Sequence, residues 1–541
     1  MSGALPDQLI VAPVLLPLVV SAVMLLINEQ SRSIKNSISL VTATANLLIA
    51  ILLLAGVVSA DQGGATGTRA YLIGDWPAPF GIVLVIDWLS ALMLVLTAVL
   101  GLAALIYSTA RWERAGPRFH ALFLLQIMGL NGAFLTGDLF NLFVFFEVLL
   151  AASYGLLLHG SGPARVKAGL HYVSINVLAS LLFLIGAALI YGVAGTLNMA
   201  DLATRIPTVV GTDLALLQSG MAILGVAFLI KAGMWPLGFW LPRTYAAAAP
   251  PSAALFAILS KVGIYAVLRV YLLLFGAEAG WTANFGEEWL LFGGMATIAF
   301  GTIGVLAVRT LRGVAGYSLL ISSGTLLAVI GAGKGAVLGG ALFYLVSSTL
   351  AIAAFYLLIE LVERTEADDH APDVTEPVFD DEYTGALPAG EEEVGVVIPA
   401  TIAILGGGFL FCAVLLSGLP PLSGFIAKFA MIHGLLGLNS TVTPAVWWLI
   451  ALLLISGLAT LVATTRAGID LLWTPERPQP LLRLSEAAPI GLLLATCLGL
   501  VILAGPAMQY MERTGVSLDD RENYIRAVLT APTVQTRGDR E

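Results

Sequence analysis

Three of the six lysine residues in this chain lie inside long apolar segments. Lys231, Lys261 and Lys428 each occur within runs rich in Leu, Ala, Val and Gly. A charge at the centre of a bilayer costs about 2.5 to 3.5 kcal/mol, so such a side chain normally faces a bundle interior, a partner or water. An ammonium group can lose its proton when it is desolvated, whereas a guanidinium group effectively cannot. The three lysines therefore predict a polar path along which protons could move.

Glu147 is the one acidic residue in the middle of an otherwise apolar predicted helix, within FNLFVFFEVLLAASYGL. Helical rise places it about 12 Å from the start of that helix, near the bilayer midplane. A carboxylate that moves toward or away from Lys231 would change how firmly the ammonium group holds its proton. We therefore predict that the two residues act as a pair. The alternative is a static salt bridge that orients two helices.

Proline residues interrupt two of the lysine-bearing segments. Pro236 follows Lys231 by five positions, and Pro420 and Pro421 precede Lys428. Proline removes a hydrogen-bond donor from the helix, and broken helices are frequent at the ion sites of transporters. We therefore predict that both helices are discontinuous.

The composition identifies the environment in which these residues must work. Of 541 residues, 58% are apolar and only 11% are charged, and the mean hydropathy is +0.93. A soluble domain carries about 25% charged residues, so this balance excludes a soluble enzyme. The apolar runs are continuous and too long for the alternating strands of a β-barrel. The sequence predicts an all-α polytopic membrane protein.

Apolar length and helix breakers predict about fourteen transmembrane helices. The first run lacks a basic leader and a cleavage site, so we expect it to stay in place as helix 1. The predicted spans are residues 8–28, 36–58, 81–108, 119–137, 139–158, 169–194, 214–241, 250–274, 288–308, 315–332, 336–362, 396–436, 445–465 and 488–510.

The two predicted broken helices, the seventh and the twelfth, are five helices apart. This spacing predicts two five-helix units, helices 4–8 and 9–13, and an odd number of helices in each implies inverted topology. We divide the chain accordingly into residues 1–118 (helices 1 to 3), 119–274 (first unit), 288–465 (second unit) and 466–541 (helix 14 and a polar C-terminal tail).

The net charge of −9 has one local source. Twelve of the 35 acidic residues lie in the stretch 363–394, together with a single base. We expect this acidic loop to be solvated and dispensable for proton movement, because dense like charge opposes folding. The rest of the chain has no basic patch of the kind that binds nucleic acid.

Lysine and arginine are distributed unequally between the predicted loops. Loops after odd-numbered helices hold fourteen of these residues and loops after even-numbered helices hold three. Because basic loops remain preferentially on the cytoplasmic side, both termini are predicted to lie outside and the acidic loop inside.

The remaining polar residues predict no metal or cofactor site. Neither the two cysteines nor the five histidines have the spacing of metal ligands, and the cysteines are predicted to serve only in packing. Four further charged residues near helix ends are expected to reach the membrane interface: Asp87, Asp138, Arg269 and Glu360.

Several strings in the sequence resemble the D subunit of Mrp-type (Pha-type) multisubunit monovalent cation/proton antiporters. More broadly, the chain is similar to the antiporter-like membrane subunits of respiratory complex I. The resemblance covers helices 2 to 14 and is carried by TGDLFNLFVFFEVLLAASYGL (136–156), YGVAGTLNMADLA (191–203), IKAGMWPLGFWLP (230–242), LSKVGIYAVLR (259–269) and LPPLSGFIAKF (419–429).

The resemblance implies roles for the buried charges. Glu147 and Lys231 would form the coupled pair, Lys261 the central relay and Lys428 the terminal site, within fourteen helices that form two inverted five-helix repeats. Relatives often carry a histidine on helix 11 where this chain has two serines. Bridging waters would then have to connect Lys261 to Lys428, held by Ser322, Ser323, Ser347 or Ser348.

The resemblance also implies partners and a location. We expect other subunits of the antiporter complex, including subunits A and C, together with membrane lipid, protons and a monovalent cation, in the inner membrane of a bacterium. The predicted function is proton translocation within a Na⁺ (monovalent cation)/H⁺ antiporter. The alternatives are a proton-pumping subunit of a redox-driven, complex I type NADH:quinone oxidoreductase and a membrane scaffold without a conducting path.

Overall fold

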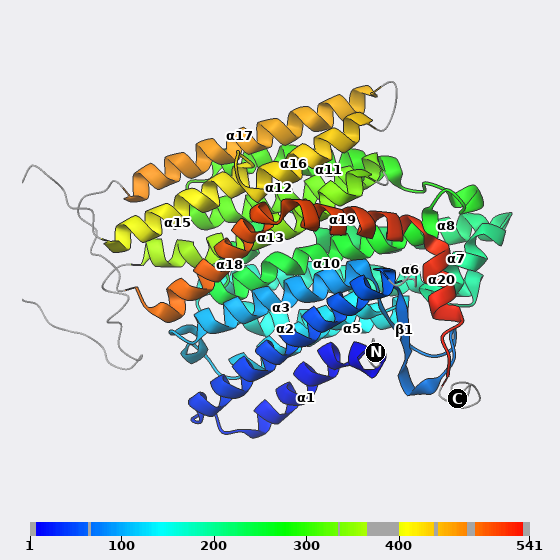
Figure 1. The fold of residues 1–541 in the computed structure, drawn as a ribbon, viewed down its shortest axis with the longest axis horizontal. Helices are drawn as coiled ribbons and strands as arrows, with labels where there is room; N and C mark the ends of the chain where they lie inside the picture. The colour runs from blue at the N-terminus through cyan, green and yellow to red at the C-terminus, as the bar shows by residue number, and fades with distance from the viewer. Residues whose placement is uncertain are drawn as a thin grey trace, which may run out of the picture.

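The computed structural model describes residues 7–62, 67–333, 336–364, 400–437, 442–472 and 482–533. These ranges contain nineteen α-helices, most of which run roughly parallel to one another in a single elongated bundle (Figure 1). Eleven of the helices are long and apolar enough to cross a membrane. The structure therefore confirms the predicted all-α polytopic class.

The first part of the bundle precedes the segment that carries Glu147. It consists of η1 (Asp7–Ile10), α1 (Ala12–Leu26), α2 (Arg32–Gln62), β1 (Arg69–Leu72), η2 (Ile73–Asp75), β2 (Val83–Ile86), α3 (Trp88–Ser108) and η3 (Trp112–Arg114).

The next group of helices carries Glu147, Lys231 and Lys261. It consists of α4 (Phe119–Leu135), α5 (Leu139–Leu158), α6 (Pro163–Ala194), α7 (Met199–Arg205), η4 (Ile206–Thr208), α8 (Thr212–Ala232), α9 (Leu241–Ala247), α10 (Pro250–Phe275) and η5 (Gly280–Thr282).

The last group carries the serines and Lys428. It consists of α11 (Glu287–Ala307), α12 (Leu311–Ala332), α13 (Ala336–Glu363), α15 (Ala400–Ser417), α16 (Ser423–Gly437), α17 (Pro444–Leu472), α18 (Leu484–Ile502), α19 (Ala504–Asp519) and α20 (Arg521–Leu529).

Each of the fourteen predicted spans coincides with a helix or with a broken pair of helices. The two predicted discontinuities are confirmed. Residues 233–240, which include Pro236, separate α8 from α9, and residues 418–422, which include Pro420 and Pro421, separate α15 from α16. The chain leaves both helices through a glycine in the left-handed region, Gly233 at φ +78° and Gly418 at φ +74°, a conformation that glycine adopts without steric cost.

Helix 3 begins later than predicted. The run Val83–Ile86 pairs antiparallel with Arg69–Leu72 instead of continuing the helix. Asp87 then caps α3, because its side chain accepts from the Ser90 backbone and the Ser90 hydroxyl accepts from Asp87 N–H. Reciprocal capping of this kind fixes the first helical turn at Trp88. The C-terminal segment also differs from the predicted polar tail, since α19 and α20 extend the helical structure to Leu529.

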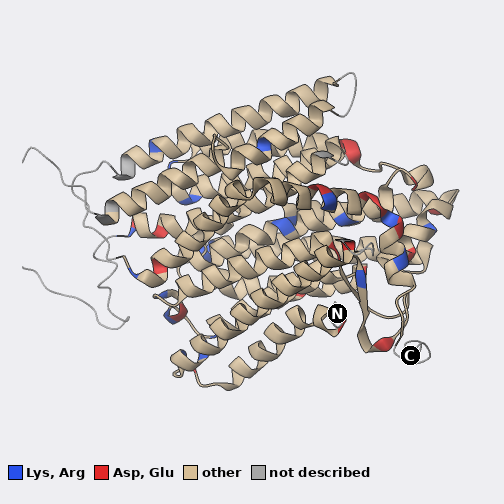
Figure 2. Ribbon diagram, viewed as in Figure 1, with Lys and Arg blue, Asp and Glu red and all other residues tan. Residues whose placement is uncertain are grey.

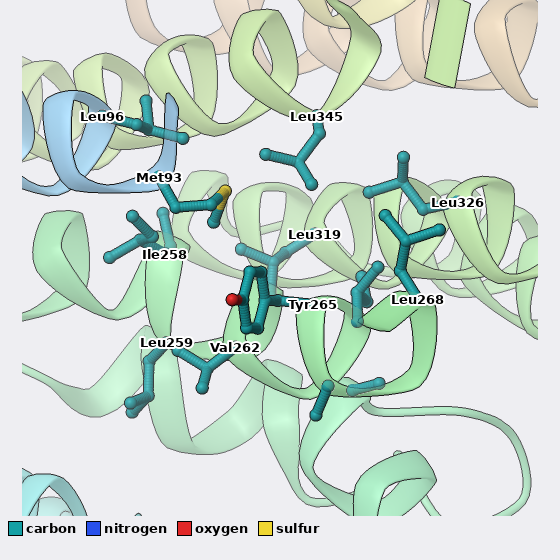
Figure 3. Packing of buried hydrophobic residues seen from close by; sticks show 14 of the residues in the cluster. Met93, Leu96, Ile258, Leu259, Val262, Tyr265, Leu268, Leu319, Leu326 and Leu345 are labelled. Atoms are coloured by element: carbon teal, nitrogen blue, oxygen red, sulfur yellow. The ribbon is translucent and has the colours of Figure 1, made fainter. Parts of the chain in front are cut away.

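The interior of the bundle is built around α10. All its residues are buried, and α12 and α13 are buried along nearly their whole length. Figure 3 shows aliphatic side chains of α3, α10, α12 and α13 packed around Tyr265. The Tyr265 hydroxyl donates to the Phe134 carbonyl at 2.6 Å. A lysine on α10 is consequently far from solvent, and Lys261 has no exposed surface.

Asp87 and Arg269 lie near helix ends, as predicted, but the structure buries both side chains in the protein. The charged residues gather toward both ends of the bundle (Figure 2), but Asp87 and Arg269 are both buried and form two hydrogen bonds of 2.5 and 2.9 Å. The ring of Tyr524 on α20 covers the guanidinium group at 5.2 Å. The C-terminal helix, which the sequence did not predict, therefore excludes solvent from this pair.

Glu360 is another charged residue near a helix end that the structure buries in the protein. It is buried at the end of α13, where it accepts hydrogen bonds from Arg364 at 2.8 Å and from Tyr107. Arg364 also donates to Glu486 of α18 at 2.7 Å. Burial opposes ionisation of Arg364, but the hydrogen bonds with the two carboxylates outweigh it and raise the pKa of the guanidinium group. This cluster ties α3, α13 and α18 together at one end of the bundle.

Three other expectations stay predictions: the solvated acidic loop, the side of the bundle that faces the cytoplasm and the division into four domains. The acidic loop, 363–394, lies almost entirely outside the described residues, which stop at 364 and resume at 400. The first helix begins and the last helix ends on the same side of the bundle (Figure 1), as an even number of crossings requires. This observation does not distinguish the cytoplasmic side from the outer side.

The Asp87–Arg269 pair generates a stability prediction. Asp87→Asn keeps the cap on α3 but leaves the Arg269 charge buried without a counter-charge, which costs about 3 kcal/mol. We expect a clearly lower midpoint of thermal unfolding in detergent. Asp61→Asn, in the exposed Arg513–Asp61 pair, is the control and should leave the midpoint unchanged. Equal midpoints for the two variants would contradict a structural role for the buried pair.

Candidate functional site

Lys261 begins a line of hydroxyl groups across three helices. Its Nζ donates to Ser322 Oγ on α12 at 2.7 Å, and Ser322 Oγ lies 2.9 Å from Ser348 Oγ on α13. Within the described part of the chain, no carboxylate forms an ion pair with this ammonium group. Neutral hydroxyls therefore provide the polar contacts of a residue that lies in the centre of the bundle.

The line continues toward the helix that carries Lys428. A cavity of about 10 Å³ adjoins Ser322 and Ser348, enough for about one water molecule. Ser347, on the same cavity, forms a hydrogen bond of 2.8 Å with Ser423, the first residue of α16. Polar side chains from α12, α13 and α17 line this cavity: Ser318, Ser322, Tyr344, Ser347, Ser348 and Thr460.

Lys428 is held at the break between α15 and α16. Its side chain is buried, and its Nζ donates to the Ser417 carbonyl at 2.9 Å. Ser417 ends α15, so its carbonyl has no continuing helix to bond. A Cβ at Gly457 of α17 would lie 2.9 Å from the Lys428 Nζ. The helix break thus supplies the hydrogen-bond acceptor, and the neighbouring glycine leaves room for the ammonium group.

Lys231 lies in the last turn of α8 without a hydrogen-bond partner among the described residues. It is buried, and its Nζ lies 5.0 Å from the centre of the Phe146 ring. A cavity of about 20 Å³ adjoins it and is also lined by Tyr172, Asn176 and Trp240. The Trp240 indole N–H likewise has no partner in the described structure. Two buried donors beside one cavity favour a water molecule as their acceptor.

Glu147 is not ion-paired with Lys231 in this structure. It is half-buried on α5, where it accepts a hydrogen bond from the Ser180 hydroxyl of α6. The adjacent residue, Phe146, is the one that contacts Lys231. The two predicted partners therefore lie near each other, but the static salt bridge considered from the sequence is not formed here.

Gly263 allows α8 to approach α10 closely. A Cβ at this position would lie 2.5 Å from the Ala232 backbone nitrogen and 2.9 Å from the Lys231 carbonyl carbon. No side chain other than that of glycine fits such a contact without displacing one of the helices. Since Lys261 precedes Gly263 by only two residues, this contact fixes the spacing between the two lysine-bearing helices.

The structure uses three serines that the sequence patterns did not indicate. Ser180 bonds Glu147, Ser417 accepts from Lys428 through its carbonyl, and Ser423 extends the hydroxyl line. Serine is too common in apolar helices for type and spacing to single these out. Conversely, Ser323 was predicted to line the path, but its buried hydroxyl has no partner in the described structure.

Among the described residues, no group of three His, Cys, Asp or Glu side chains could hold a metal ion. Both cysteines are buried and free of disulfide bonds. The candidate site therefore consists of three separate lysine ammonium groups, several serine hydroxyls and the Glu147 carboxylate. These groups can exchange protons.

Comparison with known proteins agrees with this description. The family described as NADH:quinone oxidoreductase/Mrp antiporter, TM, matches residues 136–376. The probable K(+)/H(+) antiporter D subunit of Rhizobium meliloti is 54% identical over 97% of this chain and 98% of its own length. The Na(+)/H(+) antiporter D subunit of Alkalihalophilus pseudofirmus is 33% identical over 97% of this chain and 99% of its own.

Solved structures share the fold. A chain of the Mrp complex from Dietzia sp. DQ12-45-1b superposes with a TM-score of 0.79 at 25% identity, covering 97% of this chain and all of that one. A chain of respiratory complex I from Thermus thermophilus superposes with a TM-score of 0.74 at 22% identity, over 95% and 99% of the two chains. The second comparison shows the fold alone.

The fold and the buried lysines thus define a membrane subunit of the kind that NADH:quinone oxidoreductases and Mrp antiporters share. Within this class the chain belongs to the family of D subunits of cation/proton antiporters. It is a subunit of a transporter, not an enzyme, and its structural neighbours occur in multisubunit complexes.

The close contact at Gly263 can be tested by adding one methyl group. Gly263→Ala forces α8 and α10 apart and moves Lys231 relative to Lys261, so we expect exchange activity to fall at least about tenfold, a loss equivalent to about 1.4 kcal/mol. Gly225→Ala, on an open face of α8, is the matched control and should remain fully active. The measurement is cation-dependent proton flux in membrane vesicles, at equal protein levels. Unchanged flux in Gly263→Ala would show that the spacing is not required.

Proposed function

We propose that this subunit carries protons along Glu147, Lys231, Lys261 and Lys428 while the complex exchanges a monovalent cation. The observation that supports this most strongly is that two hydrogen-bonded serine pairs, Ser322–Ser348 beside Lys261 and Ser347–Ser423 at the start of α16, meet at one small cavity. Hydroxyl groups both donate and accept, so they can pass a proton between two ammonium groups that cannot bond each other directly.

The absence of fixed counter-charges suits the lysines to this task. In the described structure no carboxylate is paired with the Nζ of Lys231, Lys261 or Lys428. Desolvation destabilises an ammonium group, and a permanent salt bridge would restabilise it. Without that bridge, a small change in a neighbouring charge or water is enough to release the proton.

Glu147 would control the first of these sites. Its carboxylate bonds Ser180, while Lys231 lies against the neighbouring Phe146. A movement of Glu147 from Ser180 toward Lys231 would favour the charged lysine, and its return would favour proton release to Lys261. Two alternative positions of one carboxylate could thus drive the transfer.

The position of Glu147 also supports a partner subunit. It lies on the same face of α5 as Phe140 and Val144, which are 53% and 41% exposed. A carboxylate on such a face would contact lipid hydrocarbon, at considerable cost, unless protein covers it. We propose that another subunit of the complex packs there, and that subunits A and C are among the partners.

The names of the relatives support a proposal for the exchanged cation and for the location. Their names specify K⁺ or Na⁺ together with H⁺, so we propose a monovalent cation exchanged across the cell membrane. The unequal distribution of basic residues between the loops supports the proposal that both termini lie outside. An NADH-quinone oxidoreductase subunit N from Desulforudis audaxviator is 32% identical but over only 78% of this chain, whereas the antiporter D subunits match 97% of it, one of them at 54% identity. The antiporter is therefore the preferred function.

The coupled pair provides one test. Glu147→Gln and Lys231→Ala each remove a titratable group, so each should abolish cation-dependent proton flux in vesicles while the complex still assembles. The matched controls are Glu288→Gln and Lys167→Ala, which change exposed charges outside the path. Wild-type flux in either pair variant would refute the relay and would favour the scaffold alternative.

The hydroxyl line provides a second test. The double variant Ser322→Ala/Ser348→Ala removes two hydroxyls without changing any charge, so we expect flux to fall by at least about tenfold, equivalent to about 1.4 kcal/mol. Ser108→Ala is the control, because this buried serine bonds only its own helix. If the double variant retains full flux, protons do not pass between Lys261 and Lys428 by this line.

A further inference from the structure

A polar pocket lies at one end of the bundle, between the α1–α2 turn and the start of α4 and apart from the lysine path. Its volume is about 280 Å³, many times that of one water molecule. Four basic side chains, two acidic ones and a histidine line it: Arg32, Lys35, Arg114, Arg118, Glu29, Glu113 and His120.

The charges of this pocket are unbalanced. Lys35 and Glu29 neutralise each other through a contact of 2.7 Å, and this hydrogen bond lowers the pKa of Glu29 below its ordinary value. The guanidinium groups of Arg32, Arg114 and Arg118 are exposed, and none forms an ion pair within the described residues. Only Glu113 opposes these three charges, so the pocket favours an anion.

The N-terminus of α4 adds backbone donors to the same pocket. Its cap residue, Arg118, has φ +60° and makes no side-chain capping hydrogen bond. The first intrahelical bond donated to this cap comes from Leu122, so the N–H groups of Phe119, His120 and Ala121 have no helical acceptor. Free N–H groups and the positive end of the helix dipole attract anions.

His120 is an independent indication of a ligand. It is 6% exposed, lines the pocket and has no hydrogen-bond partner at either ring nitrogen among the described residues. Its Nε2 lies 3.3 Å from Glu113 Oε2, the distance of an ion pair when the ring is protonated, whereas its Nδ1 has no contact of either kind among the described residues. A buried imidazole normally has a partner for at least one nitrogen, and a ligand oxygen in the pocket would provide it.

We propose that this pocket binds a phosphate group, supplied by the headgroup of an anionic phospholipid. Phosphate oxygens suit the guanidinium groups, the free N–H groups of α4 and the His120 ring. The adjoining helices α1 and α2 expose apolar side chains such as Leu25, Leu26 and Val41, which are 58%, 86% and 68% exposed. These provide a surface for the acyl chains of the same lipid. Free phosphate is the other possible source of the same chemistry.

The test compares two triple variants of the full chain in its complex. Arg32→Gln/Arg114→Gln/Arg118→Gln removes the unpaired charges of the pocket. The matched control is Lys167→Gln/Arg243→Gln/Arg309→Gln, since these side chains are also exposed and free of ion pairs in the described structure. Each protein is titrated with phosphatidylglycerol, with zwitterionic phosphatidylcholine or with inorganic phosphate. Thermal stabilisation and lipid retained in native mass spectrometry are measured.

We expect phosphatidylglycerol to bind the wild type and the control equally, and the pocket variant at least about tenfold more weakly. Phosphatidylcholine should bind less well, because it carries no net negative charge. If inorganic phosphate alone gives the same arginine-dependent stabilisation, the site binds phosphate but free phosphate is its source, which overturns the lipid assignment. Equal binding of phosphatidylglycerol and phosphate by the two triple variants, or no binding of either by the wild type, would overturn the proposal as a whole.

Discussion

The rest of this structure depends on one constraint, that three ammonium groups lie inside a membrane bundle without ion-paired carboxylates among the described residues. Such groups are costly in hydrocarbon, so each must find a polar contact within the protein. Lys261 uses Ser322, Lys428 uses the Ser417 carbonyl, and Lys231 lies at a cavity and over an aromatic ring. The helix breaks, the small cavities and the serines are understandable as the means of meeting this requirement.

The buried arginines show the opposite arrangement. Arg269 is paired with Asp87, and Arg364 is paired with Glu360 and Glu486. Guanidinium groups cannot release a proton at working pH, so a permanent partner stabilises them without affecting function. These pairs connect helices at the two ends of the bundle. The protein thus uses paired arginines for structure and leaves its central lysines unpaired, which is consistent with a fixed frame around groups that change protonation.

Close helix packing fixes the positions of the helices that carry the lysines. Gly263 brings the end of α8 against α10, and Gly457 leaves space for the Lys428 ammonium group. Both contacts place a lysine beside the backbone of a neighbouring helix. Positions so tightly packed cannot drift apart without losing contacts on both sides, so the distances along the proposed path are set by backbone packing and not by the flexible lysine side chains.

The sequence alone determined the class, the approximate positions of the long apolar helices, the two helix breaks and the four charges within apolar segments, because apolar length, proline and the cost of intramembrane charge are local properties. Only the tertiary structure decided which groups meet. It paired Asp87 with Arg269 beneath a C-terminal helix that apolar length could not predict, because α20 is short and polar. It also placed Glu147 in a hydrogen bond with Ser180, and brought two hydrogen-bonded serine pairs of α12, α13 and α16 to one cavity. Hydroxyls have no signature in sequence, so their alignment becomes visible only when those helices are packed together.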